Sequence, residues 1–118
     1  MKIEVDLMRN AADEAGELLK SLSNPHRLMI LCQLLEGERS VGELAAFLDV
    51  RSSTVSQHLA LLRREGLVAA RREAQTIFYG IASHPARRVL ETLFELFCAP
   101  AQAGICAPDP QHNPCNER

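Results

Sequence analysis

The sequence predicts a mostly helical α+β domain. Three observations support this prediction: most apolar residues recur at intervals of three and four, one segment is rich in β-branched and aromatic residues, and aromatic residues are otherwise scarce, with four Phe, one Tyr and no Trp. A core with few aromatic rings must be filled by Leu, Val, Ile and Ala, which favours helices. At 118 residues the chain has the length of one domain.

Two helices are predicted in the first third of the chain. Apolar residues at helical spacing predict the first helix over 6–22, with acidic residues on its opposite side. Asn24 can cap the second helix and Pro25 fits its first position. This helix carries Cys32 and ends at Gly37.

Two further helices follow closely. Ser40 and Glu43 have the spacing of a capping box, which predicts a short third helix that stops around Asp49. A fourth helix then starts at Ser52 or Ser53. Its expected buried stripe consists of Val55, Leu59 and Leu62.

A small hairpin and a last helix complete the predicted domain. Gly66 suits a left-handed helix end, and 67–72 and 76–81 are predicted strands that make a two-stranded wing. The last helix begins near Ser83 and runs to about Cys98. Apolar residues cover more than one face of it, so we expect a partner chain to bury the excess. These apolar residues are Val89, Leu90, Leu93, Phe94, Leu96 and Phe97.

The composition changes at the end of the domain. Residues 99–118 contain four prolines and almost no apolar periodicity. We therefore predict one folded domain over 1–98 and an irregular, flexible tail over 99–118.

Charge is distributed unevenly along the chain. The formal net charge is −2, but the segment 51–76 holds five basic and two acidic residues, which leaves it at +3 and the remainder at −5. A basic centre in an acidic protein suggests a face that meets a polyanion, although a solvated helix end would give the same charge pattern.

The third and fourth predicted helices are joined by a short turn around Val50, which is the spacing of a helix-turn-helix. Short hydroxyl side chains let a helix enter the major groove, Gln and His can bind base edges, and Arg can bind phosphates. A polar, capped surface helix would show the same side chains. The candidate DNA contacts on the fourth helix are Ser52, Ser53, Thr54, Ser56, Gln57, His58 and Arg63, and those in the hairpin are Arg71, Arg72, Gln75 and Thr76.

The chain has four cysteines and no segment typical of a signal peptide or a membrane span, so a cytoplasmic location is expected. A structural disulfide framework is therefore not expected, and redox chemistry or metal binding becomes the alternative. No nucleophile–base constellation or phosphate loop is present, so we expect no enzyme activity and no cofactor.

Two segments carry a family resemblance: SNPHRLMILCQLLEGERSVGELA and SSTVSQHLALLRREGLVAARREAQTIFYGI. They resemble the ArsR/SmtB family of winged-helix repressors, over roughly residues 10–98. The resemblance implies a winged helix-turn-helix that forms a homodimer through its first and last helices. It also implies binding of double-stranded DNA at a palindromic operator and release by an inducer.

The family's sensing sites differ between branches. In the metalloid-sensing branch the third helix carries a Cys-x-Cys motif, whereas the similar segment here, VGELAAFLDV, has no cysteine. In the zinc-sensing branch the last helix carries paired His and Asp ligands, and this sequence offers only His84 there. The pairing of Cys32 with Cys98 resembles the persulfide- and redox-responsive SqrR/BigR branch. That resemblance implies reactive sulfur species or oxidants as the inducer, although Cys32 as a small buried hydrophobe is an alternative.

A metal site is the second alternative. Soft ligands for zinc, copper(I) or a metalloid are available in the last helix and the tail, although their spacing matches no compact metal motif. These residues are Cys98, Cys106, His112 and Cys115.

Overall fold

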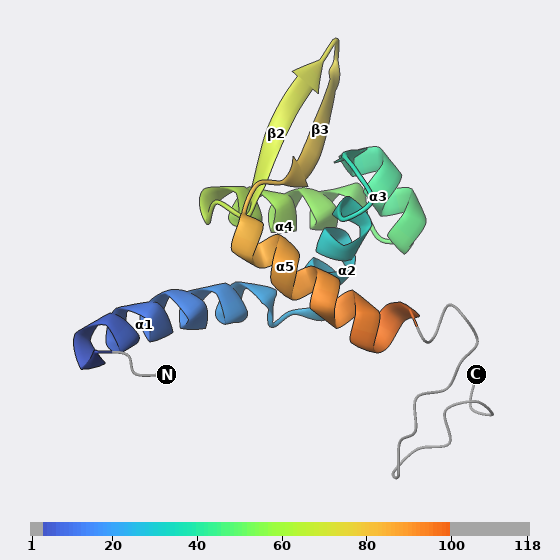
Figure 1. Cartoon of the computed structure of the whole chain (residues 1–118). Coiled ribbons are helices and arrows are strands. Elements are labelled where there is room, and N and C mark those ends of the chain that lie inside the picture. Colours follow the sequence, from blue (N-terminus) through green and yellow to red (C-terminus); the bar gives the residue numbers. More distant parts are fainter. Residues whose placement is uncertain (1–3, 100–118) are drawn as a thin grey trace, which may run out of the picture.

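The computed structural model describes residues 4–99, which form the predicted order of helices and a wing (Figure 1). Apart from Ala99, the predicted tail lies outside the described residues, as do Cys106, His112 and Cys115. The elements are α1 (Val5–Leu22), α2 (Pro25–Leu34), β1 (Arg39–Ser40), α3 (Val41–Leu48), α4 (Ser52–Arg64), β2 (Val68–Glu73), β3 (Thr76–Ile81), α5 (His84–Leu93) and η1 (Phe94–Cys98).

Caps confirm the predicted starts of the second and third helices and the end of the third, whereas α2 ends at Leu34, three residues before the predicted Gly37. The Asn24 side chain accepts a hydrogen bond from the Arg27 amide at 3.1 Å. Ser40 and Glu43 form the complete capping box, with bonds of 3.1 and 2.9 Å. Asp49 ends α3 in the left-handed region at φ 57°. These local bonds satisfy backbone groups that a helix end leaves unpaired, which is why short sequence motifs located the boundaries well.

The core lies between α2, α3, α4 and α5. The predicted stripe of α4 is completely buried, because Val55, Leu59 and Leu62 are each 0% exposed. Leu90 from α5 is equally buried, so the last helix closes one side of this core. The helix-turn-helix is therefore held from behind by apolar packing, while the polar side of α4 stays outside.

Helix α1 extends away from this core (Figure 1). Only its last residues, Ser21 and Leu22, are buried, and the Ser21 hydroxyl donates a 2.6 Å hydrogen bond to Glu65 at the end of α4. Leu7 and Leu19 remain 61% and 58% exposed. The chain by itself therefore leaves most of the apolar side of α1 uncovered.

The wing differs from the prediction in two respects. Strands β2 and β3 pair antiparallel from Val68↔Ile81 to Glu73↔Thr76, so Glu73 belongs to the strand, and Ala74 adopts a left-handed φ of 56° in the two-residue turn. The two-stranded sheet was also incomplete as a prediction, because β1 adds to β3 and makes the order β1-β3-β2. A two-residue strand is too short to show periodicity in a sequence.

The last helix changes its winding near its end. Ser83 caps α5 by accepting a hydrogen bond from the Ala86 amide at 3.2 Å. From Phe94 to Cys98 the helix becomes a π-helix, in which the Ala99 amide donates to the Phe94 carbonyl. Such wide turns are rare in proteins overall, but those that occur are often found at functional sites. Within residues 4–99, no helix is long and apolar enough to span a membrane.

Candidate DNA-binding surface and thiol pair

The polar side of α4 is largely exposed, as the sequence predicts. Ser52, Ser53, Ser56, Gln57 and Arg63 all lie on the surface. The expectation that the whole set is exposed was wrong at two positions, because Thr54 and His58 are half-buried. The side chains free to meet a groove are therefore mainly those of the first turns of α4, together with Gln57.

The partial burial of His58 has an identifiable cause. Its ring stacks on that of His26, at the start of α2, with centroids 5.9 Å apart and planes 23° apart. Loss of solvent, followed by the charges of Arg27 and His26, lowers the pKa of His58 below its usual value. His58 thus contacts α2 as well as forming part of the α4 surface, and its lowered pKa favours the neutral imidazole.

In the wing, acidic side chains bind Arg71. Its Nε and Nη2 donate to Glu38 Oε1 at 3.0 and 2.7 Å, and its Nη1 donates to Glu73 Oε1 at 3.2 Å. The guanidinium also lies over the Phe78 ring, 5.2 Å from the centroid. Hydrogen bonding to Arg71 lowers the pKa of the Glu38 carboxyl. A DNA phosphate would have to compete with these carboxylates for Arg71.

Glu38 reaches Arg71 by crossing β3. A Cβ at Gly80 would lie 3.3 Å from the Glu38 Cγ, so the glycine leaves room for the glutamate stem. Glu38 follows Gly37, which adopts φ 148° after the end of α2. We call Glu38, Arg71, Phe78 and Gly80 the wing clamp, since together they join the segment after α2 to both long strands.

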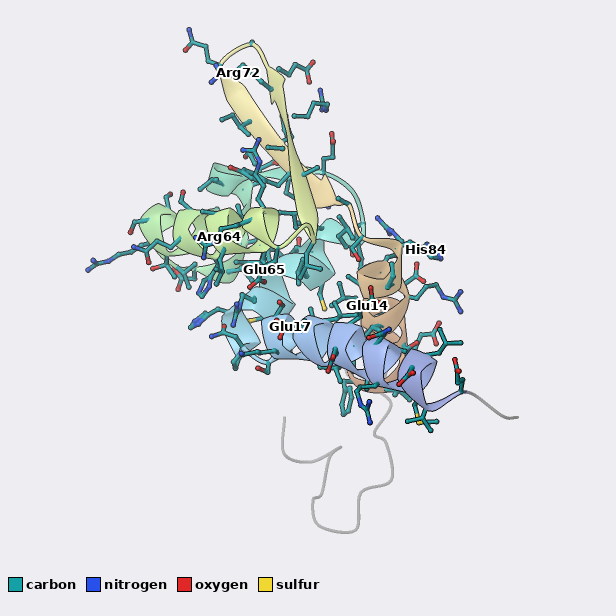
Figure 2. The ribbon with its side chains drawn as sticks, turned by 90° about the vertical axis from the view of Figure 1, so that its left-hand side faces the viewer. Glu14, Glu17, Arg64, Glu65, Arg72 and His84 are labelled. Atoms are coloured by element: carbon teal, nitrogen blue, oxygen red, sulfur yellow. The ribbon has the colours of Figure 1, made fainter. Side chains whose placement is uncertain are left out.

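The remaining wing residues are available to solvent. Arg72, Gln75 and Thr76 are exposed, and Figure 2 shows Arg72 near the tip of the hairpin, well away from Glu14 and Glu17 on α1. The uneven charge of the sequence therefore becomes a spatial separation between these positions: a basic residue near the wing tip and acids on α1. A polyanion would be repelled less at the wing tip than beside these acids on α1.

The two candidate sensing cysteines come together. Cys32 lies in α2 and Cys98 at the end of η1, and both are free thiols that are half-buried. Burial is the main cause that raises the pKa of the Cys32 thiol, and the charge of Cys98 and a side-chain hydrogen bond with it add to the effect. The two thiols are therefore neighbours that come from different elements and line the same hollow.

An open apolar hollow of about 580 Å³ lies beside both thiols. Its walls come from α2, α3 and the end of the last helix, so it connects the helix-turn-helix with α5. The lining residues are Leu28, Met29, Cys32, Gln33, Glu36, Phe47, Leu48, Leu93, Phe94, Phe97 and Cys98.

Metal ligands do not gather within the described part of the chain. Residues 4–99 hold no group of three or more His, Cys, Asp or Glu side chains suited to a metal ion. Of the four alternative ligands only Cys98 is described, and His84 is exposed at the start of α5. The metal site over Cys98, Cys106, His112 and Cys115 thus stays a sequence prediction.

Several residues of these sites were not found from the sequence. Glu38 is 33 positions from Arg71, and His26 is far from His58 in the chain, so no local spacing indicated either contact. The only available signals were indirect: a glutamate directly after a glycine, and a histidine next to a helix-opening proline.

Comparison with known proteins agrees with this geometry. Residues 24–70 match the model of the bacterial regulatory proteins of the arsR family. The chain is 48% identical to the biofilm growth-associated repressor of Agrobacterium fabrum over 86% of each chain. Reduced HlyU from Vibrio cholerae matches at 47% identity with a TM-score of 0.76, covering 80% of this chain and 99% of that one.

Two other solved structures support the same assignment. The transcriptional repressor BigR from Xylella fastidiosa is 42% identical, with a TM-score of 0.75 over 81% of this chain and 95% of that one. A homodimeric winged helix-turn-helix domain from Mycobacterium bovis is 29% identical, with a TM-score of 0.66 over 92% of this chain and 100% of that one. The protein is therefore a winged helix-turn-helix transcription regulator of the arsR family, and not an enzyme.

Proposed function

We propose that this regulator is a homodimeric repressor that binds a palindromic operator and leaves it when Cys32 and Cys98 become covalently linked. Reactive sulfur species or oxidants are the proposed inducer. The observation that carries the proposal is the contact between two free thiols, one in α2 and one at the end of the last helix.

The proposed DNA contact uses α4 and the wing. The exposed Gln57 supplies a base-edge donor and acceptor, while Ser52, Ser53 and Ser56 have the short hydroxyls that suit close approach to the groove. Arg63, Arg72, Gln75 and Thr76 are exposed and would meet the backbone. Within the proposal, Thr54 and His58 contact DNA only at the edge of this surface, and Arg71 contacts it only after release from Glu38.

The proposed dimer uses α1 and the last helix. Val5, Leu7 and Met8 are exposed at one end of α1, and Leu96 and Phe97 are exposed on η1. Apolar groups in this number are unusual on a monomer surface and favour an interface. The homodimeric winged helix-turn-helix domain from Mycobacterium bovis supports dimerisation.

The proposed chemistry is thiol exchange. The thiolate of Cys32 attacks a sulfur of a persulfide or disulfide, the reagent's S–S bond breaks, and a thiolate leaves. Cys98 then attacks the Cys32 sulfur of this mixed species, expels the second group as a thiolate and leaves a disulfide. If a second persulfide first transfers its outer sulfur to the Cys32 persulfide and departs as a thiolate, Cys98 instead attacks the sulfur next to Cys32 Sγ, expels sulfide and leaves a bridge of three sulfurs. The reagent takes up the two electrons that the cysteines lose.

Linking the thiols would change how the two recognition helices are presented. Cys32 lies in α2, which packs against α4, whereas Cys98 lies in the proposed dimer interface. Two recognition helices in successive major grooves need a separation of about 34–36 Å. A shift in that spacing weakens binding because the operator cannot adjust to it without cost.

The test combines mass spectrometry with operator binding. A persulfide donor should add sulfur across Cys32 and Cys98 and weaken operator binding, and Cys32→Ser and Cys98→Ser should each repress constitutively. Cys106→Ser and Cys115→Ser are the matched controls and should still respond. If instead the tail variants lose the response while Cys32→Ser keeps it, the proposal is wrong, and a sensor that includes Cys106 and Cys115 replaces it.

A further inference from the structure

A group of basic side chains lies where the start of α2 meets α4, apart from both the wing and the thiol pair. The His26 ring stacks on the His58 ring, with centroids 5.9 Å apart. Arg27, the next residue of α2, is close enough for its charge to lower the pKa of His58. We call His26, Arg27 and His58 the α2–α4 junction. It brings a cation of α2 to the side of the predicted recognition helix.

The charge of Arg27 is not neutralised by the protein. Within residues 4–99 the arginines that form ion pairs are Arg9, Arg39 and Arg71, and Arg27 is not among them. Its Nε is buried and has no hydrogen-bond partner in this part of the chain. The residue as a whole is half-buried, so part of it is open to solvent. The guanidinium therefore keeps its charge for an acceptor from outside, and its planar fork suits carboxylate and phosphate oxygens.

The α2–α4 junction borders the exposed side of α4. Gln57 and His58 are consecutive, so their side chains leave the helix about 100° apart. Gln57 is exposed, whereas His58 and Thr54, one turn earlier, are half-buried. A helix with its side chains is about 10–12 Å across and the major groove is about 12 Å wide, so phosphates lie close to the flanks of an inserted helix. The start of α2 is on one of these flanks.

Arg27 also differs from the arginine of the wing clamp. Arg71 is bound by Glu38 and Glu73, and a phosphate would have to displace these carboxylates. No such exchange is needed at Arg27. Of these two half-covered cations, Arg27 is therefore the one that a phosphate can reach without breaking an ion pair within the described residues.

We propose that Arg27 binds a phosphate of the DNA backbone, with the exposed His26 beside it as a second donor, so that the start of α2 contacts DNA together with α4 and the wing. This inference rests on the DNA-binding part of the proposed function and does not depend on the thiols. Because a phosphate carries no base identity, Arg27 adds affinity and fixes the position of α4 on the duplex without reading sequence.

The first experiment measures affinity against salt concentration. The probes are a duplex that the wild-type chain selects from a random-sequence pool and an unrelated duplex. We expect Arg27→Gln to weaken binding to both by a similar factor, at least about fivefold at low salt, and to reduce the salt dependence by about one counterion per protomer. Arg27→Lys keeps the charge and should keep the salt dependence. Arg9→Gln, which removes the same charge from an exposed position on α1, is the matched control.

The second experiment locates the contact on the DNA. In the selected duplex, one phosphate at a time is replaced by a neutral methylphosphonate. At the phosphate that Arg27 binds, this replacement should weaken binding by the wild-type chain and by Arg9→Gln. It should cost Arg27→Gln much less, because that interaction is already lost and the two changes are not additive.

A labelling measurement on the wild-type chain gives a result even if Arg27→Gln does not fold. Phenylglyoxal modifies accessible guanidinium groups, and mass spectrometry locates the modified arginines with and without the selected duplex. We expect the duplex to protect Arg27 and Arg72 but not Arg9.

Three results would each overturn the inference. These are equal salt dependence in Arg27→Gln and Arg9→Gln, no phosphate at which the two variants respond differently, and equal labelling of Arg27 with and without a duplex that protects Arg72. Failure of the proposed function would show separately, because the wild-type chain would then select no duplex from the pool.

Discussion

At the scale of single residues, two kinds of information decided what could be predicted. Val55, Leu59 and Leu62 were found because burial on a helix repeats along the sequence, and all three are fully buried. The meeting of Cys32 with Cys98 had no such signal, since the two are 66 positions apart, and only the family resemblance pointed to it. The stacking of His58 on His26 was missed for the same reason.

Gln57 is the residue whose loss should reduce sequence recognition most directly. We expect Gln57→Ala to weaken operator binding by about 1–3 kcal/mol, because a base-edge contact is lost, and to leave folding unchanged, because the side chain is exposed. Competition titrations with operator and unrelated duplex measure this, with Glu17→Ala on α1 as the control. Unchanged operator affinity in folded Gln57→Ala would remove Gln57 from the contact set.

Cys98 should influence the acidity of Cys32. Burial raises the Cys32 pKa first, and Cys98 raises it further, so Cys98→Ala should shift the pH–rate profile of Cys32 alkylation to lower pH. Because the raised pKa disfavours the Cys32 thiolate, the variant should form more thiolate than the wild type at the same pH. The profiles are compared in chains that also carry Cys106→Ser and Cys115→Ser. Superimposable profiles would show that the two side chains do not interact in solution.

At the scale of elements, local capping motifs predicted most helix boundaries, whereas the strands of the wing were predicted only in part. The hairpin was predicted from β-branched and aromatic residues, whereas β1 has two residues and was invisible. Adding β1 to the sheet brings Glu38, which directly precedes it, across β3 to Arg71. The orientation of the wing therefore depends on a contact that joins distant parts of the sequence.

The wing clamp gives a prediction about DNA affinity. In Glu38→Gln the guanidinium of Arg71 loses its main anionic partner, so it becomes available to phosphates. We expect tighter binding to unrelated duplex and a salt dependence steeper by up to about one counterion. Anisotropy titrations over a range of salt concentrations measure both quantities.

Glu36→Gln is the matched control for this prediction, since it removes a neighbouring carboxylate that binds Arg39 instead. Identical behaviour of Glu36→Gln and Glu38→Gln would mean that only net charge matters. Arg72→Ala, which affects an exposed residue near the wing tip, should lower affinity for all sequences alike.

At the scale of the whole molecule, the described chain leaves many apolar side chains exposed on its surface. Helix α1 touches the core only at its end, and its apolar residues remain outside together with those of η1. The sequence predicted this from the last helix, which has more apolar residues than one core can cover. A second copy of the chain would thus be needed to bury these apolar side chains.

The predicted homodimer can be broken by charge on α1. We expect the wild-type chain to sediment as a dimer at micromolar concentration, and Leu7→Glu with Leu19→Glu to shift it towards monomer and to weaken operator binding, since both half-sites must be engaged. Glu14→Gln, on the same helix, is the control for helix content. A well-behaved wild-type monomer at that concentration would contradict the predicted assembly.

The π-helical winding of η1 also bears on which changes of chain length the protein tolerates. A π turn holds one residue more than an α turn between the bonded groups, and here the bond runs from the Ala99 amide to the Phe94 carbonyl. We expect deletion of one residue inside this segment to restore ordinary α winding and to leave Cys98 beside Cys32, whereas a deletion earlier in α5 should rotate the thiol away. A chain that is one residue shorter between Phe94 and Cys98 should therefore keep the two cysteines in register.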